Sequence, residues 1–191
     1  MSTELVIGES ARPDHWSIYG YPRETTPRLA RNPNVIAFRN AIAQVAVTRV
    51  SVPLILTRGT LEHPGRTARE RSIVSAFNEV GFRTHWLSTQ QSDPYTGVIN
   101  RYSSEATSQR FFERRFDEIL AEHAAKLLGD KAEKKLFLVL HMMGSHFEYT
   151  SRYPDRFDKF DASAPGRAGL VNAYDNTLLY TDYVVSRVIL H

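Results

Sequence analysis

A run of five apolar residues, Leu136-Phe137-Leu138-Val139-Leu140, limits the fold more than any other segment. Successive side chains of a strand point to opposite faces, so a strand without polar residues is buried on both sides. Such strands lie inside parallel sheets whose two faces are covered by helices. The run therefore predicts an α/β protein, in which the rest of the chain supplies the helices and the neighbouring strands.

The remaining segments alternate between strand and helix patterns. Short apolar runs predict three further strands, at residues 5–8, 35–38 and 84–87. Thr26-Pro27 predicts the start of a short helix. Helical spacing predicts longer helices at about 73–80, 108–128 and 168–190, and a capping box at 67–70 precedes the helix at 73–80. This alternation predicts a three-layer α/β/α sandwich with a mostly parallel sheet.

Composition excludes several classes of protein. The chain has no cysteine, which rules out disulfides, thiolate zinc sites and cysteine nucleophiles. The net charge of +3 is spread along the chain, so we expect no nucleic-acid partner. No apolar run approaches the roughly 20 residues of a membrane helix, and no secretory signal is present. The 191 residues suit one domain, and the abrupt start suggests a piece of a longer protein.

Ligands of open α/β sheets bind beyond the carboxyl ends of the strands. Glu9 follows the first strand, Gln90 and Gln91 follow the strand at 84–87, and residues 141–146 follow the central one. Glu9, with Asp14 and His15 close behind, offers the carboxylate and imidazole ligands that divalent metals take. Alternatively, Glu9 caps the following turn.

Thr48 and Ser51 precede Pro53, a residue that can open a helix. A hydroxyl at a helix N-terminus is placed to act as a nucleophile beside a bound phosphate. Simple helix capping by Thr48 or Ser51 is the alternative. His141 and His146, in one loop with Gly144, could orient a charged group or be structural. The basic and aromatic segment at 152–160 could cover a site or be ordinary surface.

Together these segments resemble phosphoethanolamine transferases, zinc enzymes of the alkaline phosphatase and sulfatase superfamily. Residues 8–12 (Gly-Glu-Ser-Ala-Arg) and 15–27 resemble the opening motif of that family. Residues 141–146 with 152–154 are similar to its "H-x-x-G-S-H … R-Y-P" segment, and residues 172–182 to its "N-x-Y-D-N-T-x-x-Y-x-D" helix. The likeness covers nearly the whole chain, in the family's order.

The resemblance implies roles for five residues. Glu9 falls on the first metal carboxylate of the family, and Thr48 falls on its nucleophilic threonine, which also ligates zinc. His146 falls on a substrate-contacting histidine, and Gln90 and Gln91 fall on a polar pair that faces substrate. The implied reaction moves phosphoethanolamine from a phospholipid donor to a lipopolysaccharide acceptor, core or lipid A, through a phospho-threonine intermediate.

This chain departs from the pattern of the family at several points. The remaining zinc ligands of the family lie in a "D-H-G-E" motif after the last helix, and its N-terminal membrane helices precede the catalytic domain; neither is in this chain. The absence of cysteine, and of a lysine shortly after Gln91, favours the branch that modifies the lipopolysaccharide core. We therefore expect residues 1–191 to be the N-terminal part of a sulfatase-like catalytic domain, C-terminally incomplete. The resemblance places the full enzyme in the inner membrane, with this domain in the periplasm.

Two alternatives stay open. A hydrolase of the same superfamily is one, although the sulfatase pattern C/S-x-P-x-R has Ile55 where arginine is needed. An inactive fragment is the other. We expect the chain alone to be inactive because zinc ligands are missing, and to self-associate through an exposed sheet edge.

Overall fold

The computed structural model describes residues 1–92, 97–132 and 134–189. The chain divides into two compact units. The first, here called the sheet unit, comprises residues 1–7, 42–115 and 123–142. The second, the α7 unit, comprises residues 8–41, 116–122 and the chain from Met143 onward.

The sheet unit contains a four-stranded parallel sheet with the strand order β1-β4-β2-β3. Its strands are β1 (Ser2–Ile7), β2 (Arg83–Ser88), β3 (Ser108–Phe111) and β4 (Leu136–His141). Every residue of β4 is buried, as its uninterrupted apolar run requires, and β4 pairs with a strand on each side. The predicted central strand and parallel sheet are therefore confirmed.

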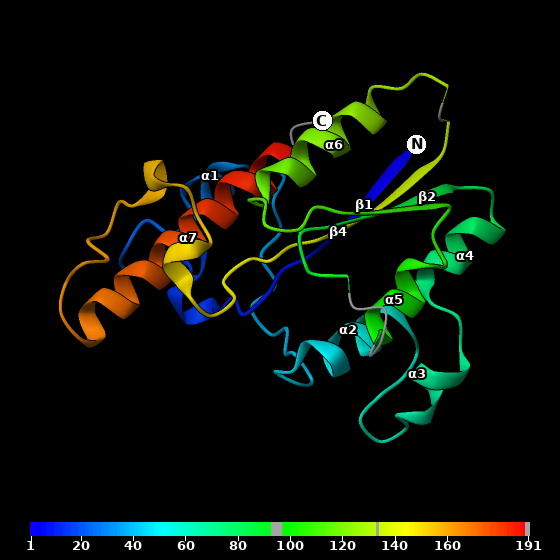
Figure 1. Cartoon of the computed structure of the whole chain (residues 1–191), viewed down its shortest axis with the longest axis horizontal. Helices are drawn as coiled ribbons and strands as arrows, with labels where there is room; N and C mark the ends of the chain where they lie inside the picture. Colours follow the sequence, from blue (N-terminus) through cyan, green and yellow to red (C-terminus); the bar gives the residue numbers. More distant parts are fainter. Residues whose placement is uncertain (93–96, 133, 190–191) are drawn as a thin grey trace. The chain divides into compact units, whose positions relative to one another are not determined.

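Helices cover the sheet in this unit (Figure 1). They are α2 (Thr48–Leu56), α3 (Gly65–Arg69), α4 (Ile73–Glu79) and α5 (Val98–Ser103), joined by residues 123–128 of α6 (Glu118–Leu128). The core on one face of the sheet joins α2, α4 and α5 to the strands through Ile7, Val52, Leu56, Val74, Trp86, Tyr102, Phe137 and Val139. Residues 123–128 of α6 lie on the opposite side of the sheet from α4 and α5 (Figure 1), which completes the predicted α/β/α layering.

The α7 unit is built on one long helix, α7 (Arg167–Ile189). Its other helices are α1 (Pro27–Arg31) and four short 3-10 helices, η1 (Pro13–His15), η2 (Ser17–Tyr19), η3 (Tyr149–Ser151) and η4 (Asp155–Phe157). Buried Asp182 of α7 accepts hydrogen bonds from the backbone N–H groups of Arg28 and Leu29, at 3.0 and 2.9 Å. A side chain of α7 thus supplies the N-terminal cap that α1 lacks locally.

Two of the element predictions are wrong. Residues 35–38 form no strand, and Ile36 and Phe38 are largely exposed rather than buried in a sheet. The helix predicted from residue 108 begins only at Glu118, because residues 108–111 instead pair with β2 as the edge strand β3. The periodic apolar residues Phe112 and Phe116 lie outside that helix. The last predicted helix is confirmed as α7, although residue 190 lies outside the described residues.

Two predicted helix starts also need correction. The α4 helix is capped by Ser72, not by the predicted box at 67–70, and the Ser72 hydroxyl accepts from the backbone N–H of Val74. Glu105 holds Ser72 in place by accepting from both its N–H and its hydroxyl, at 2.9 and 2.7 Å. Pro53 does not open α2 but lies inside it. Within the described residues, no helix combines the length and apolarity that crossing a membrane requires.

Candidate functional site

The loops that follow the strands of the sheet unit are hydrogen-bonded to one another, as the predicted rim requires. The backbone N–H of Met142, just after β4, donates to the carbonyl of Ile7 at the end of β1 (3.0 Å). The N–H of Thr89, just after β2, donates to the carbonyl of His141 (3.1 Å). The side-chain amide of Gln90 donates to the carbonyl of Met142 at 2.8 Å. Gln90 therefore braces two post-strand loops, whereas Gln91 is exposed.

Thr48 lies at the first position of α2, in the sheet unit. The N-cap residue is Val47, whose side chain has no oxygen to accept a hydrogen bond. Neither Thr48 nor Ser51 is the capping residue, so the alternative of simple N-capping is wrong. Thr48 is half-buried, and its hydroxyl sits in the first turn, where backbone N–H groups without intrahelical partners favour an anion.

Glu9 belongs to the α7 unit, and its backbone is fixed from two directions. The N–H of Ser145 donates to the Glu9 carbonyl at 2.9 Å. A Cβ on Gly144, whose φ is +53°, would lie 2.9 Å from both the backbone nitrogen and the backbone oxygen of Glu9. Only glycine therefore allows this approach. The hydroxyl of Ser10 donates to the carboxylate oxygen Oε1 of Glu9 at 2.7 Å.

The loop that carries Gly144 is itself held by residues that sequence reasoning missed. The buried carboxylate of Asp117 accepts from the backbone N–H groups of Met143 and Gly144, at 2.9 and 2.8 Å. The hydroxyl of Thr177, on α7, lies 2.7 Å from the hydroxyl of buried Ser145. Thr177 could have been found from its place in the α7 motif, but no sequence signal marked Asp117.

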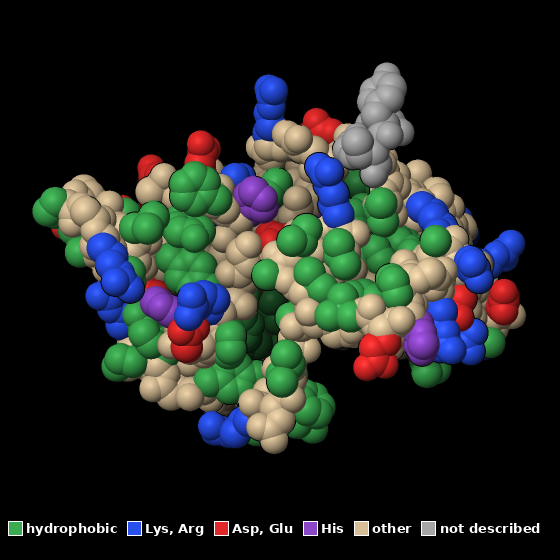
Figure 2. All heavy atoms as spheres, turned by 90° about the horizontal axis from the view of Figure 1, so that it is seen from below, with side chains coloured by type: hydrophobic (Ala, Val, Ile, Leu, Met, Phe, Trp, Pro, Cys, Tyr) green, Lys and Arg blue, Asp and Glu red, His purple; other side chains and the backbone are tan. Residues whose placement is uncertain are grey.

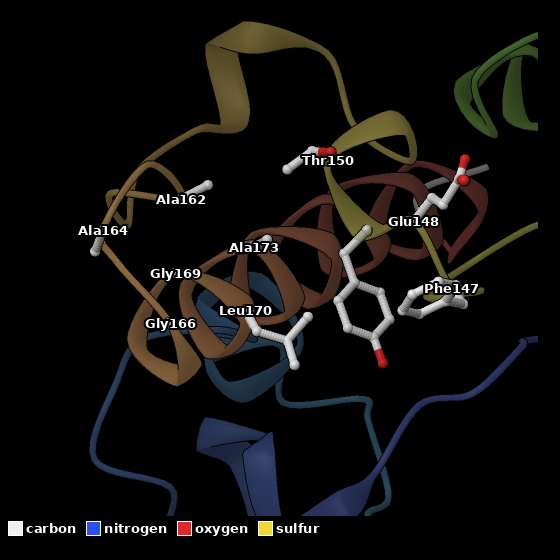
Figure 3. A pocket seen from close by; sticks show the side chains of 10 residues that line it. Phe147, Glu148, Thr150, Ala162, Ala164, Gly166, Gly169, Leu170 and Ala173 are labelled. Carbon is white, nitrogen blue, oxygen red and sulfur yellow. The ribbon is translucent and has the colours of Figure 1, made fainter.

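His146 follows this loop and is exposed. Arg152 fixes the backbone around it, since its guanidinium donates to the carbonyls of His146 (3.2 Å) and Phe147 (2.8 Å). An open pocket of about 310 Å³ lies just beyond, between residues 147–150 and α7 (Figure 3). Leu170 and small residues of α7 and the preceding loop line one side of it, and residues 147–150 line the other. The segment after residue 146 thus shapes a surface pocket in the α7 unit.

The motif at residues 172–182 contacts the N-terminal part of the α7 unit through buried Asp175. One carboxylate oxygen of Asp175 lies 2.7 Å from Nδ1 of His15, and the other accepts from Tyr21 and Arg23, both at 2.8 Å. Burial, followed by the hydrogen bond to Asp175, raises the pKa of Tyr21 to about 12. These contacts of Asp175 hold residues 15–23 against α7 and join two motifs that are far apart in the sequence. We call this set of contacts the latch.

Neighbouring Tyr174 extends this latch to the chain that follows Glu9. Its hydroxyl accepts from the backbone N–H of Arg12 and donates to the carbonyl of Ser10, both at 2.8 Å. Burial raises the pKa of Tyr174 to about 12. The chain that follows Glu9 is therefore held to α7 by two hydrogen bonds of Tyr174.

Asp14 and His15, the possible metal ligands near Glu9, have other partners in the structure. Asp14 forms a two-point ion pair with Arg12, whose hydrogen bond lowers the pKa of that carboxyl, and His15 contacts Asp175. Among residues 1–92, 97–132 and 134–189, no three His, Asp or Glu side chains gather in a group that could hold a metal ion. Zinc takes three or four protein ligands, so the described residues do not form a complete zinc site.

The five predicted site residues are divided between the two units. Thr48, Gln90 and Gln91 lie in the sheet unit, and Glu9 and His146 lie in the α7 unit.

Known proteins resemble this chain along nearly its whole length. The Kdo(2)-lipid A phosphoethanolamine 7''-transferase of Escherichia coli K12 is 32% identical over 200 residues, which cover 97% of this chain and 35% of that protein. The zinc complex of the C-terminal periplasmic domain of EptC from Escherichia coli superposes with a TM-score of 0.89 at 30% identity, covering 99% of this chain and 58% of that one. The integral membrane protein lipooligosaccharide phosphoethanolamine transferase A of Neisseria meningitidis gives a TM-score of 0.82 at 25% identity, covering 99% and 38%.

The chain thus spans about a third of the length of its curated relatives, 35% for the first of them. The sequence model of the sulfatase family matches residues 5–190, nearly all of the chain. Together with the parallel sheet and its helical layers, this match shows that the chain belongs to the sulfatase family, with phosphoethanolamine transferases among its relatives.

Proposed function

We propose that this chain is part of the catalytic domain of a phosphoethanolamine transferase. The complete enzyme moves phosphoethanolamine from a phospholipid to a lipopolysaccharide, on its core or on lipid A. The observation that carries the proposal is the hydroxyl of Thr48 in the first turn of α2. Within the α7 unit, the backbone of Glu9 held by Gly144 and Ser145 is consistent with it. The relatives named as phosphoethanolamine transferases supply the substrate class.

Thr48 is the proposed nucleophile. Its Oγ attacks the phosphorus of the donor, so that an Oγ–P bond forms and the bond from phosphorus to the glycerol oxygen breaks. The diacylglycerol leaves with the proton of the Thr48 hydroxyl. An acceptor hydroxyl oxygen then bonds to phosphorus, the Oγ–P bond breaks, and the acceptor's proton returns to Thr48 Oγ. The electropositive first turn of α2 favours the phosphate that undergoes both displacements.

Glu9 and Thr48 are the proposed zinc ligands. The zinc complex of the named relative supports zinc as the metal. Two oxygen donors are fewer than zinc requires, so a complete site needs further donors. The clamp on the backbone of Glu9 would hold its carboxylate in one orientation toward that metal.

His146, Gln90 and Gln91 are the proposed substrate-binding residues. The imidazole of His146 is exposed on a backbone that Arg152 fixes, which suits a group that contacts a phosphoryl oxygen. Gln91 is exposed, whereas the amide of Gln90 is used within the protein. Inner-membrane attachment and a periplasmic position for this domain are proposed with the function, in line with the relatives described as integral membrane and periplasmic.

The test uses the complete protein that contains this chain, supplied with phosphatidylethanolamine and lipopolysaccharide. Mass spectrometry follows the modified lipopolysaccharide and the released diacylglycerol. We expect Thr48→Ala to lose transfer and Ser51→Ala, one turn along the same helix, to keep it. The reverse pattern would favour a hydrolase that uses Ser51 in the C/S-x-P position, and release of free sulfate from an aryl sulfate would support that alternative directly.

A further inference from the structure

The turn that follows Glu9 is strained. Ser10 has a φ of +53°, in the left-handed region that residues with a Cβ seldom adopt. Such a conformation persists only where the surrounding structure imposes it. The Glu9 carbonyl accepts from the N–H of Ser145 at 2.9 Å, and the Ser10 carbonyl accepts from the Tyr174 hydroxyl at 2.8 Å. The strained turn is therefore held at two consecutive carbonyls.

Thr177 connects these two contacts to each other. It lies on α7 three residues after Tyr174, and therefore on the same side of the helix. Its hydroxyl donates to the Tyr174 carbonyl at 2.6 Å and lies 2.7 Å from the Ser145 hydroxyl. The contacts close a ring, here called the Thr177 ring, that runs from Glu9 through Ser145 and α7 back to Ser10.

The central contact of the Thr177 ring is buried. Ser145 is 0% exposed and Thr177 is 1% exposed. These two residues contribute almost nothing to the surface drawn in Figure 2, where hydrophobic and charged side chains are mixed. Water therefore cannot replace a lost partner, and removing the Thr177 hydroxyl leaves the Ser145 hydroxyl without the contact that fixes it.

We propose that Thr177 is a positioning residue for Glu9. It acts through Ser145 on the carbonyl of Glu9, and through Tyr174 on the strained backbone of Ser10. The hydroxyl of Ser10 in turn donates to the Glu9 carboxylate at 2.7 Å, so the conformation of this turn sets the direction of the carboxylate. Groups that hold a metal ligand without touching the metal strengthen metal binding. The inference rests on the proposed role of Glu9 as a zinc ligand.

The first test measures zinc binding by the complete protein that contains this chain, stripped of metal, in competition with a chromophoric chelator. Thr177→Val keeps the shape of the side chain without its hydroxyl, and we expect it to weaken zinc binding about tenfold. Thr177→Ser keeps the hydroxyl and should bind zinc as the unchanged protein does. Thr181→Val is the matched control, because Thr181 is buried one turn along α7 and outside the Thr177 ring. It should leave zinc binding unchanged.

A double-mutant cycle separates the Thr177 ring from a general loosening of α7. Ser145→Ala removes the other hydroxyl of the same contact but keeps the N–H that reaches Glu9, so it should also weaken zinc binding. Ser145→Ala/Thr177→Val should bind zinc no more weakly than the weaker single variant, because both substitutions remove one contact. In metal-free protein, hydrogen exchange of the peptide that contains Ser145 should be faster in Thr177→Val than in Thr181→Val.

Glu9→Gln tests the role on which the inference rests. If Glu9→Gln weakens zinc binding and Thr177→Val does not, the positioning role of Thr177 is overturned while Glu9 stands as a ligand. Additive losses in the double variant, or an equal loss in Thr181→Val, would also overturn the positioning role. Unchanged zinc binding in Glu9→Gln would overturn both the ligand assignment and this inference.

Discussion

The backbone N–H of Ser145 donates a hydrogen bond of 2.9 Å to the carbonyl oxygen of Glu9. This contact joins the chain after β1 to the loop after β4, two segments more than 130 residues apart in the sequence. Asp117 and Thr177 hold that loop from its other side. The proposed metal carboxylate therefore sits on a backbone that several distant parts of the α7 unit determine together.

Gly144→Ala should destabilise the chain. The new methyl group would lie 2.9 Å from two backbone atoms of Glu9, at a residue whose φ is +53°. Backbone strain and overpacking of this kind cost about 2 kcal/mol or more. Chemical denaturation followed by circular dichroism measures the loss. Gly8→Ala is the control, because a methyl there meets no atom within 4 Å, and its free energy of unfolding should be unchanged or slightly raised. Equal free energies of unfolding for the two variants would show that Gly144 does not pack closely against the backbone of Glu9.

Asp175→Asn should loosen the latch between residues 15–23 and α7. The substitution removes a buried negative charge that faces His15 and Arg23, and such losses cost about 3 kcal/mol. The pKa of Tyr21 should also fall from about 12 toward 10, since the Asp175 carboxylate contributes to raising it. Ultraviolet titration of the phenols detects this change. Asp14→Asn removes an exposed pair with Arg12 and a smaller contribution to the pKa of Tyr21, so both quantities should change less than in Asp175→Asn. An unchanged pKa of Tyr21 in Asp175→Asn would contradict the contribution of the Asp175 carboxylate to that pKa.

Stability should fall in alkaline solution partly through Tyr174. Its pKa is about 12 in the folded chain and near 10 when unfolded, so the folded state holds the phenolic proton more tightly. The contribution is fully present below pH 10 and is lost as the pH rises through about 12. Tyr174→Phe should remove this part of the pH dependence and cost about 1–2 kcal/mol at neutral pH through two lost hydrogen bonds. Unfolding free energies measured at neutral and alkaline pH test both statements. If the free energy of unfolding of Tyr174→Phe fell at alkaline pH as much as that of the unchanged chain, the role given to Tyr174 would be contradicted.

The two neighbouring glutamines should respond differently to truncation. Gln90→Ala removes the bond from the side-chain amide to the Met142 carbonyl and should cost about 1 kcal/mol of stability. Gln91→Ala should leave stability unchanged, because Gln91 is exposed, and should instead raise the KM of the complete enzyme for its donor. Thermal unfolding and steady-state kinetics separate these effects. A KM effect from Gln90→Ala without any loss of stability would reverse the assigned roles.

The parts of the fold that sequence could predict are those set by local chemistry. The apolar run of β4 could only be a strand buried on both faces, and it is one. Thr26-Pro27 marked the start of α1, and the period of α7 gave nearly its full length. Elements decided by distant partners were missed. Residues 108–111 form a strand because β2 offers an edge to them, and Ser72 caps α4 because Glu105 holds it there.

The candidate site divides in the same way. Glu9, Thr48 and the loop before His146 could be proposed as site residues because short motifs mark them. Glu9 and that loop follow the ends of the paired parallel strands β1 and β4. The residues that fix them were mostly not predicted. Asp117 gave no signal, because its role depends on two backbone N–H groups 26 and 27 residues away. His15 contacts buried Asp175 through Nδ1, and this contact holds its motif against α7.

The most direct test of the account looks for the covalent intermediate. The complete protein is mixed with phosphatidylethanolamine in the absence of acceptor, quenched, digested and analysed by mass spectrometry. The account predicts a peptide that carries one phosphoethanolamine group on Thr48 and loses it when lipopolysaccharide is added before quenching. An active protein whose Thr48 stays unmodified, or which carries the group on Ser51, would contradict it.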